Sequence, residues 1–119
     1  MPIVDVTCSD RVSSKTKRAL GDRLPELVSE AVECEAEPYD RQLRPGDVTL
    51  RFHDFGPWDR TGVDVLIEVK SKWFDDRARN RQDRADTILH GLTDLAADEI
   101  FVGVYLTMPV AAWAQSDET

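Results

Sequence analysis

Cysteine and histidine are scarce in this chain. Its 119 residues include two cysteines, Cys8 and Cys34, and two histidines, His53 and His90. Two cysteines are too few for a disulfide scaffold or a cysteine zinc site, and they favour a reduced, cytoplasmic setting. The histidines lie far apart and share no spacing typical of metal ligands. The sequence therefore predicts a protein that holds no metal ion.

Long hydrophobic runs and nucleotide-binding motifs are also lacking. No segment approaches the roughly 20 apolar residues that a membrane span needs, and the N-terminus lacks the pattern of a signal peptide. GxSxG, GxGxxG and P-loop motifs do not occur in the sequence. We therefore expect no membrane association, no serine-hydrolase site and no cofactor.

Positive charge is in deficit. Lysine and arginine number 15 against 23 acidic residues, which gives a net charge of −8. A chain this acidic repels phosphate backbones, so nucleic acid is not an expected partner.

Apolar residues make up 41% of the chain. This share is enough for one hydrophobic core, and the length fits one domain.

Apolar periodicity predicts four strands and two helices. Alternating β-branched residues indicate strands over 2–8, 48–52, 63–69 and 100–106. Apolar residues at helical spacing indicate helices over 15–33 and 80–97, with 70–79 as a connection. Pro25 interrupts the first helical pattern, so that helix either kinks there or a new helix begins near that point.

The order strand–helix–strand occurs twice, as a weak internal repeat over about 2–56 and 62–107, followed by a short C-terminal tail. Helical crossovers make the strands of each unit parallel. The predicted fold class is α/β (α+β): one domain with a four-stranded mixed sheet and both helices on one face. Residues Ile67, Val69, Val102 and Val104 suggest that the other face is not fully polar. Oligomerisation through that face follows.

Pro2 is the first candidate for chemistry. Cells usually remove Met1 when a proline follows, which leaves a secondary amine. An α-amino group titrates near pH 8, and an apolar pocket lowers the pKa of such a cation toward 7, a value that suits a general base. The alternative is that Met-Pro begins many chains without any functional meaning.

Three segments carry a family resemblance: MPIVDVTCSDR at the start, PYDRQ at 38–42 and TMPVAAW at 107–113. With the doubled strand–helix–strand order, they resemble the long members of the tautomerase superfamily, which includes 4-oxalocrotonate tautomerase, macrophage migration inhibitory factor (MIF) and malonate semialdehyde decarboxylase. The resemblance implies a cofactor-free isomerase, provided that Met1 is removed. Pro2 would move a proton between carbon and oxygen of a small 2-oxo or 2-hydroxy-enoic acid. It also implies a homotrimer.

The resemblance further implies basic residues that hold the substrate carboxylate. Six of the 15 basic residues fall between Lys70 and Arg84, and Lys72, Arg77 and Arg79 are the best candidates, with Arg77 preferred. Interleaved aspartates leave open that these charges form surface pairs only. The remaining candidates for substrate binding are Arg11, Asp40, Tyr105 and Trp113.

The sequence also departs from the family pattern. WFDD is inserted after the third predicted strand, so either Lys72 or Arg77 takes the place of the family's key arginine. Val28 and Gln115 stand where the cis-dehalogenase branch carries its histidine and glutamate, which disfavours dehalogenase or hydratase activity. Three alternatives remain: a non-catalytic oligomer of this fold that binds a small anion or a protein, a decarboxylase-like member, and an interaction module of ferredoxin-like shape.

Overall fold

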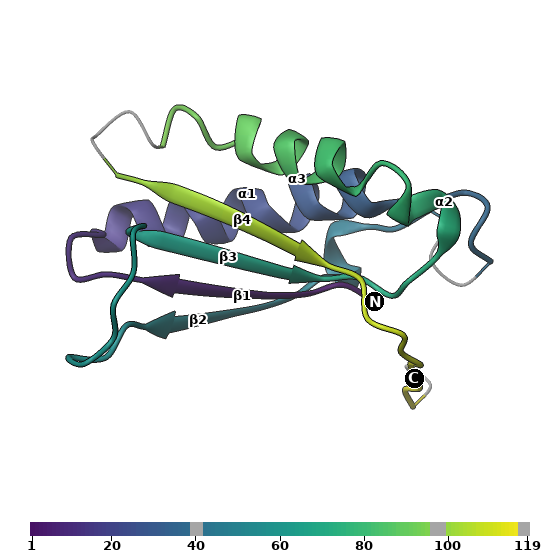
Figure 1. Ribbon diagram of the computed structural model, residues 1–119, viewed down its shortest axis with the longest axis horizontal. Helices are drawn as coiled ribbons and strands as arrows, with labels where there is room; N and C mark the ends of the chain where they lie inside the picture. The colour runs from purple at the N-terminus through teal and green to yellow at the C-terminus, as the bar shows by residue number, and fades with distance from the viewer. Residues whose placement is uncertain (39–41, 96–99, 117–119) are drawn as a thin grey trace.

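The computed structural model describes residues 1–38, 42–95 and 100–116, and it consists of one sheet with helices on a single face (Figure 1). The chain order is strand–helix–strand twice, as the sequence predicts. The elements are β1 (Ile3–Cys8), α1 (Ser14–Val32), the 3-10 helix η1 (Pro45–Asp47), β2 (Thr49–Asp54), β3 (Val65–Lys70), α2 (Asp75–Ala78), α3 (Arg81–His90) and β4 (Val102–Thr107).

The sheet is mixed and has the strand order β2-β1-β3-β4. β1 and β2 are parallel, β3 and β4 are parallel, and the two units meet through the antiparallel pair β1 and β3. Each parallel pair needs a long crossover. The first unit supplies it with α1, and the second with α2 and α3 (Figure 1). The predicted fold class is therefore confirmed.

Helix α1 continues through Pro25. It begins after Ser13, whose hydroxyl accepts a hydrogen bond from the Thr16 backbone N–H at 3.1 Å. An internal proline costs about 3 kcal/mol or more. Leu24 and Val28 on either side of it are both 0% exposed in the common core, and each such burial contributes about 1.5–3 kcal/mol. Packing therefore offsets the proline, and no new helix begins there.

The second crossover differs from the single helix predicted over 80–97. Helix α3 ends at His90, and the last residues of the predicted helix lie outside the described residues. A Cβ atom at Gly91 would collide with the side chain of Leu27 in α1, so this close approach of the two helices requires glycine. The four-residue helix α2 lies within the segment that was predicted as a connection.

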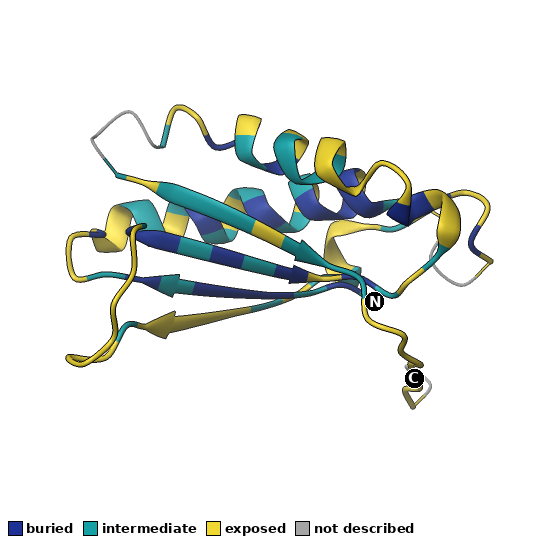
Figure 2. Cartoon of the chain, viewed as in Figure 1, coloured by how far each residue is buried: buried dark blue, intermediate teal, exposed yellow. Residues whose placement is uncertain are grey.

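The two faces of the sheet carry different residues, and Figure 2 shows buried residues alternating with less buried ones along β3. Ile67 and Val69 are 0% exposed, and Val102 and Val104 pack against the same core as the helices. The prediction that these four residues make the uncovered face partly apolar is therefore wrong, because strand alternation turns them toward the helices. The uncovered face carries their neighbours, including the cross-strand row Arg51, Asp5, Glu68 and Tyr105.

Candidate functional site

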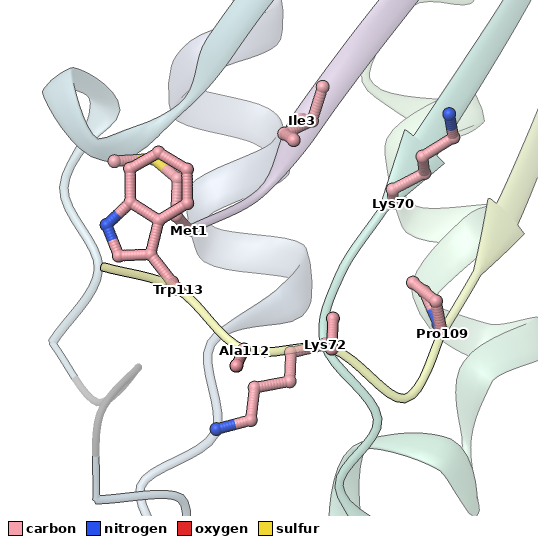
Figure 3. Close-up of a pocket in the computed structure, with 8 residues that line it drawn as sticks. Met1, Ile3, Lys70, Lys72, Pro109, Ala112 and Trp113 are labelled. Carbon is pink, nitrogen blue, oxygen red and sulfur yellow. The ribbon is translucent and has the colours of Figure 1, made fainter. Parts of the chain in front are cut away.

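A cavity of about 590 Å³ lies at the end of the sheet where β1 begins and where β3 and β4 end. Its walls come from the first residues of the chain, the segment after β3 and the tail after β4. The lining residues are Met1, Ile3, Lys70, Lys72, Pro109, Ala111, Ala112 and Trp113. Figure 3 shows the indole ring of Trp113 beside Met1, with Lys70 and Pro109 across the cavity in this view.

Backbone hydrogen bonds fix the segments that form the walls of the cavity. The Pro2 carbonyl accepts from the Thr49 N–H at 3.0 Å, which fixes the chain just before β1. The Thr107 carbonyl accepts from the Ser71 N–H at 3.0 Å. The tail therefore follows the segment that carries Lys72, and Trp113 reaches the cavity although its residue number is far from those of Met1 and Lys72.

Pro2 is buried, and Met1 next to it lines the cavity. While Met1 is attached, the Pro2 nitrogen is an amide and cannot accept a proton. Removal of Met1 would leave a secondary amine at the wall of the cavity. Of the predicted site residues, Lys72 and Trp113 line this cavity, and Pro2 follows the lining residue Met1 in the chain. Their roles remain predictions.

The cavity has basic character. Its lining within the described part of the chain includes two charged side chains, and both are lysines. Lys70 is the last residue of β3 and Lys72 follows it by two positions, and their side chains extend in opposite directions in the view of Figure 3. Sequence reasoning missed Lys70, and its position at a strand end close to Lys72 was the available signal. A small carboxylate is the kind of ligand that such a cavity favours.

Arg77 is not brought to the cavity. Its side chain is 0% exposed. Its Nε donates to the Val32 carbonyl at 2.7 Å, and its Nη1 donates to the Lys72 carbonyl at 2.5 Å. A guanidinium buried in this way cannot meet a solute in the described protomer. The preference for Arg77 over Lys72 as the substrate contact therefore loses its support, and the geometry favours Lys72.

The other predicted site residues that the structure describes lie away from the cavity. Arg79 forms an exposed ion pair with Asp76. Tyr105 is 62% exposed on the uncovered face of the sheet. Arg11 lies at the opposite end of β1, where it pairs with Asp64 at 3.4 Å. Asp40, in the segment PYDRQ, lies outside the described residues.

Two carboxylates away from the cavity are held by hydrogen bonds. Asp64 accepts from the Phe101 backbone N–H at 3.1 Å and from the Ser9 hydroxyl at 3.0 Å, and these bonds lower its pKa. On the uncovered face, Asp5 accepts from Arg51 at 2.9 Å, and this bond is the largest cause of its lowered pKa. Both groups are therefore held in the charged form by local contacts.

Neither a metal site nor a membrane span is present in the described part of the chain. No group of three or more His, Cys, Asp or Glu side chains there is placed to hold a metal ion. None of the described helices has the length and apolar character to cross a bilayer.

Comparison with known proteins identifies relatives by structure alone. Neither a protein-family model nor a curated protein sequence matches the chain. An MIF-like protein from Entamoeba histolytica has a TM-score of 0.62 at 14% identity, over 97% of this chain and 95% of that one. Malonate semialdehyde decarboxylase has a TM-score of 0.64 at 14% identity, over 98% and 92%. A fused 4-oxalocrotonate tautomerase, a symmetric trimer, has a TM-score of 0.57 at 13% identity, over 91% and 85%.

These likenesses extend over nearly the whole chain, and they show that it has the tautomerase/MIF fold. This agrees with the fold that the sequence resemblance implied. At such low identity they show the fold alone, so the chemistry has to be argued from the cavity itself.

Proposed function

We propose that this protein is a cofactor-free, tautomerase-like isomerase that acts on a small 2-oxo or 2-hydroxy-enoic acid. The observation that carries the proposal is the position of Met1 in the wall of a basic cavity, directly before the buried Pro2. Removal of Met1 would place a secondary amine at a cavity that two lysines also line. One solved structure with this fold, Pt0534, is inactivated by 2-oxo-3-pentynoate, a small oxo acid (TM-score 0.60, 15% identity).

The proposed reaction moves one proton. The Pro2 amine accepts the proton from the 2-hydroxyl group of the enol, and the resulting ammonium donates a proton to C3, which gives the 2-oxo acid with no gain or loss of atoms. An α-amino group has a pKa near 8, and a partly apolar cavity lowers that of the cation. Lys70 and Lys72 would hold the carboxylate and so place the enol beside the amine.

A homotrimer is part of the proposal. The sheet has one face without helices, and a fused relative with the same fold is a symmetric trimer. Because that face carries a charged row, the contacts between subunits would be more polar than the sequence suggested. Light scattering should give three times the 13.5 kDa protomer mass. A protomer mass at micromolar concentration would contradict this assembly.

The test of the reaction is ketonisation of phenylenolpyruvate by protein whose N-terminus has been established by mass. Met1-processed protein should accelerate the reaction, and Pro2→Ala should lower the rate about 100-fold, within the range that general acid–base catalysis contributes. Alanine retains a primary amine, so a small residual rate is expected. Equal rates for the two proteins would exclude the prolyl amine as the base.

A non-catalytic anion-binding role is the second candidate. The two lysines in the lining favour it, because they can hold a carboxylate whether or not the prolyl nitrogen is a free amine. Retention of Met1 in the natural protein, together with binding of a carboxylate that is not turned over, would select this function instead.

A further inference from the structure

Behind the cavity lies a buried charge pair that the proposed reaction does not use. Glu37 is 1% exposed and Arg77 is 0% exposed. Ionised side chains are rarely buried unless they are paired, and such pairs often contribute little net stability. Glu37 follows the end of α1, whereas Arg77 belongs to α2. A contact that joins these two segments beside the candidate site therefore suggests a role connected with that site.

The carboxylate of Glu37 lies between two cations. Its Oε1 atom is 3.8 Å from Lys72 Nζ, and its Oε2 atom is 3.9 Å from Arg77 Nη2. Arg77 in turn donates to the backbone carbonyl of Lys72 at 2.5 Å and to that of Val32 at 2.7 Å. Lys72 is thus contacted twice: Arg77 holds its backbone, and Glu37 faces its ammonium group.

Of these three residues, Lys72 lines the cavity, and its side chain is 32% exposed. Neither Glu37 nor Arg77 is among the lining residues. Lysine carries a compact charge on a flexible four-carbon stem, so its direction has to be set by its neighbours. Glu37 and Arg77 supply this constraint, and neither of them lines the cavity in which a ligand would bind.

We propose that Glu37 and Arg77 are positioning residues that hold Lys72 for an anion in the cavity. This inference rests on the proposed function only for the identity of the anion. Glu37 sets the direction of the Lys72 ammonium group, and Arg77 fixes the backbone from which the Lys72 side chain begins. The orientation of the cavity cation therefore depends on α2, the helix that carries Arg77.

The first experiment needs no ligand. Competitive labelling of amines with acetic anhydride, followed by mass spectrometry, compares Lys72 with Lys70 in one sample. Lys72 should react several-fold more slowly than Lys70, because its ammonium group is held by a carboxylate. Glu37→Gln should bring Lys72 to about the rate of Lys70 and leave Lys70 unchanged. An unchanged rate for Lys72 would overturn the inference.

The second experiment is a double-mutant cycle with phenylacetate as the probe anion, measured by calorimetry. Glu37→Gln should weaken binding at least tenfold in the wild-type background and less than twofold in the Lys72→Ala background. A general structural defect would cause the same loss in both backgrounds. Unchanged or tighter binding by Glu37→Gln would show that Glu37 competes for Lys72 instead of positioning it.

The two experiments separate the inference from the proposed function. Slow labelling of Lys72 that depends on Glu37, in a protein that binds no phenylacetate, would support the positioning and contradict the anion site. If Glu37→Gln does not fold, Glu37→Asp keeps a charge for Arg77 and withdraws the carboxylate by one methylene. The same rise in Lys72 labelling is then expected, and its absence would again overturn the inference.

Discussion

The two ends of the sheet differ in what their charged residues contact. At the end where β3 begins, Asp64 accepts hydrogen bonds from Ser9 and Phe101 and pairs with Arg11. At the other end, Lys70 and Lys72 line a cavity beside Met1. One end is a set of contacts completed within the described protomer, and the other presents two cations to a cavity.

This difference shows why a basic residue near a strand end cannot be assigned a role from the sequence alone. Arg11 and Lys72 both follow strands, and the family resemblance suggested a substrate contact for each. Arg11 lies within reach of the buried carboxylate of Asp64, just before β3, whereas Lys72 lines a cavity. We call the end with Asp64 and Arg11 the closed end, and the end with Lys70 and Lys72 the cavity end. Four predictions test the contrast between them.

The largest effect on stability is expected behind the cavity, from Arg77→Ala. This change leaves the buried Glu37 carboxylate without its arginine and removes the donors to two backbone carbonyls. Breaking a buried pair in this way costs about 3–5 kcal/mol. Urea unfolding should show that loss, whereas Arg79→Ala, in an exposed pair, should cost less than about 1 kcal/mol. If Arg77→Ala had normal stability and a raised KM for phenylenolpyruvate, Arg77 would be a substrate contact after all.

The next effect is expected at the closed end, from Asp64→Ala. The change leaves the Phe101 N–H and the Ser9 hydroxyl without their acceptor, which should cost about 2 kcal/mol at neutral pH. The pKa of Asp64 lies below its usual 3.8, so its contribution is present above about pH 4 and lost as pH falls through the lower, folded value.

The stability difference between wild type and Asp64→Ala should therefore shrink in acid. Asp54→Ala is the matched control, because Asp54 is 84% exposed in its pair with Lys17, and its effect should stay within about 1 kcal/mol. A difference for Asp64→Ala that is constant from pH 7 to pH 2 would show that its charge does not contribute.

The fold could be predicted from the sequence because it depends on local patterns. Alternation places strands, and apolar spacing marks the helices that cover them. Which face of the sheet the helices cover was harder to predict. Alternation shows that Ile67 and Glu68 point to opposite sides, but only the packed structure shows which of these sides is covered. The end of α3 at His90 was likewise not predicted, because the apolar spacing continues past it to Leu92 and Leu95.

The candidate site could be predicted only in part. Pro2 and Trp113 were selected through the family resemblance, and the fold brings Met1 and Trp113 to one cavity. Arg77 was placed at the substrate site because its guanidinium suits a carboxylate, and the charged residues around it in the sequence gave no sign of its burial. Its burial comes from acceptors distant in the sequence, such as the Val32 carbonyl. Such non-local contacts leave no pattern in a single sequence.

A smaller effect is expected at the cavity end, from Lys72→Ala. If Lys72 holds the substrate carboxylate, KM for phenylenolpyruvate should rise at least tenfold, which corresponds to about 1.4 kcal/mol of lost binding. The free energy of unfolding should change less than in Arg77→Ala, because the Lys72 side chain is partly exposed. An unchanged KM would leave Lys70 as the candidate contact, and Lys70→Ala would then be expected to raise KM instead.

The smallest effect is expected from Arg11→Ala, the counterpart of Lys72→Ala at the closed end. The Arg11 side chain is 55% exposed, and its pair with Asp64 spans 3.4 Å, so water screens the charges and the loss should be below about 1 kcal/mol. Asp64 keeps its bonds from Ser9 and Phe101. KM for phenylenolpyruvate should stay within twofold of wild type, because Arg11 lies at the far end of β1 from the cavity. A tenfold rise in KM would mean that Arg11 reaches a substrate site, for instance one completed by a second copy of the chain, and that the closed end also binds ligand.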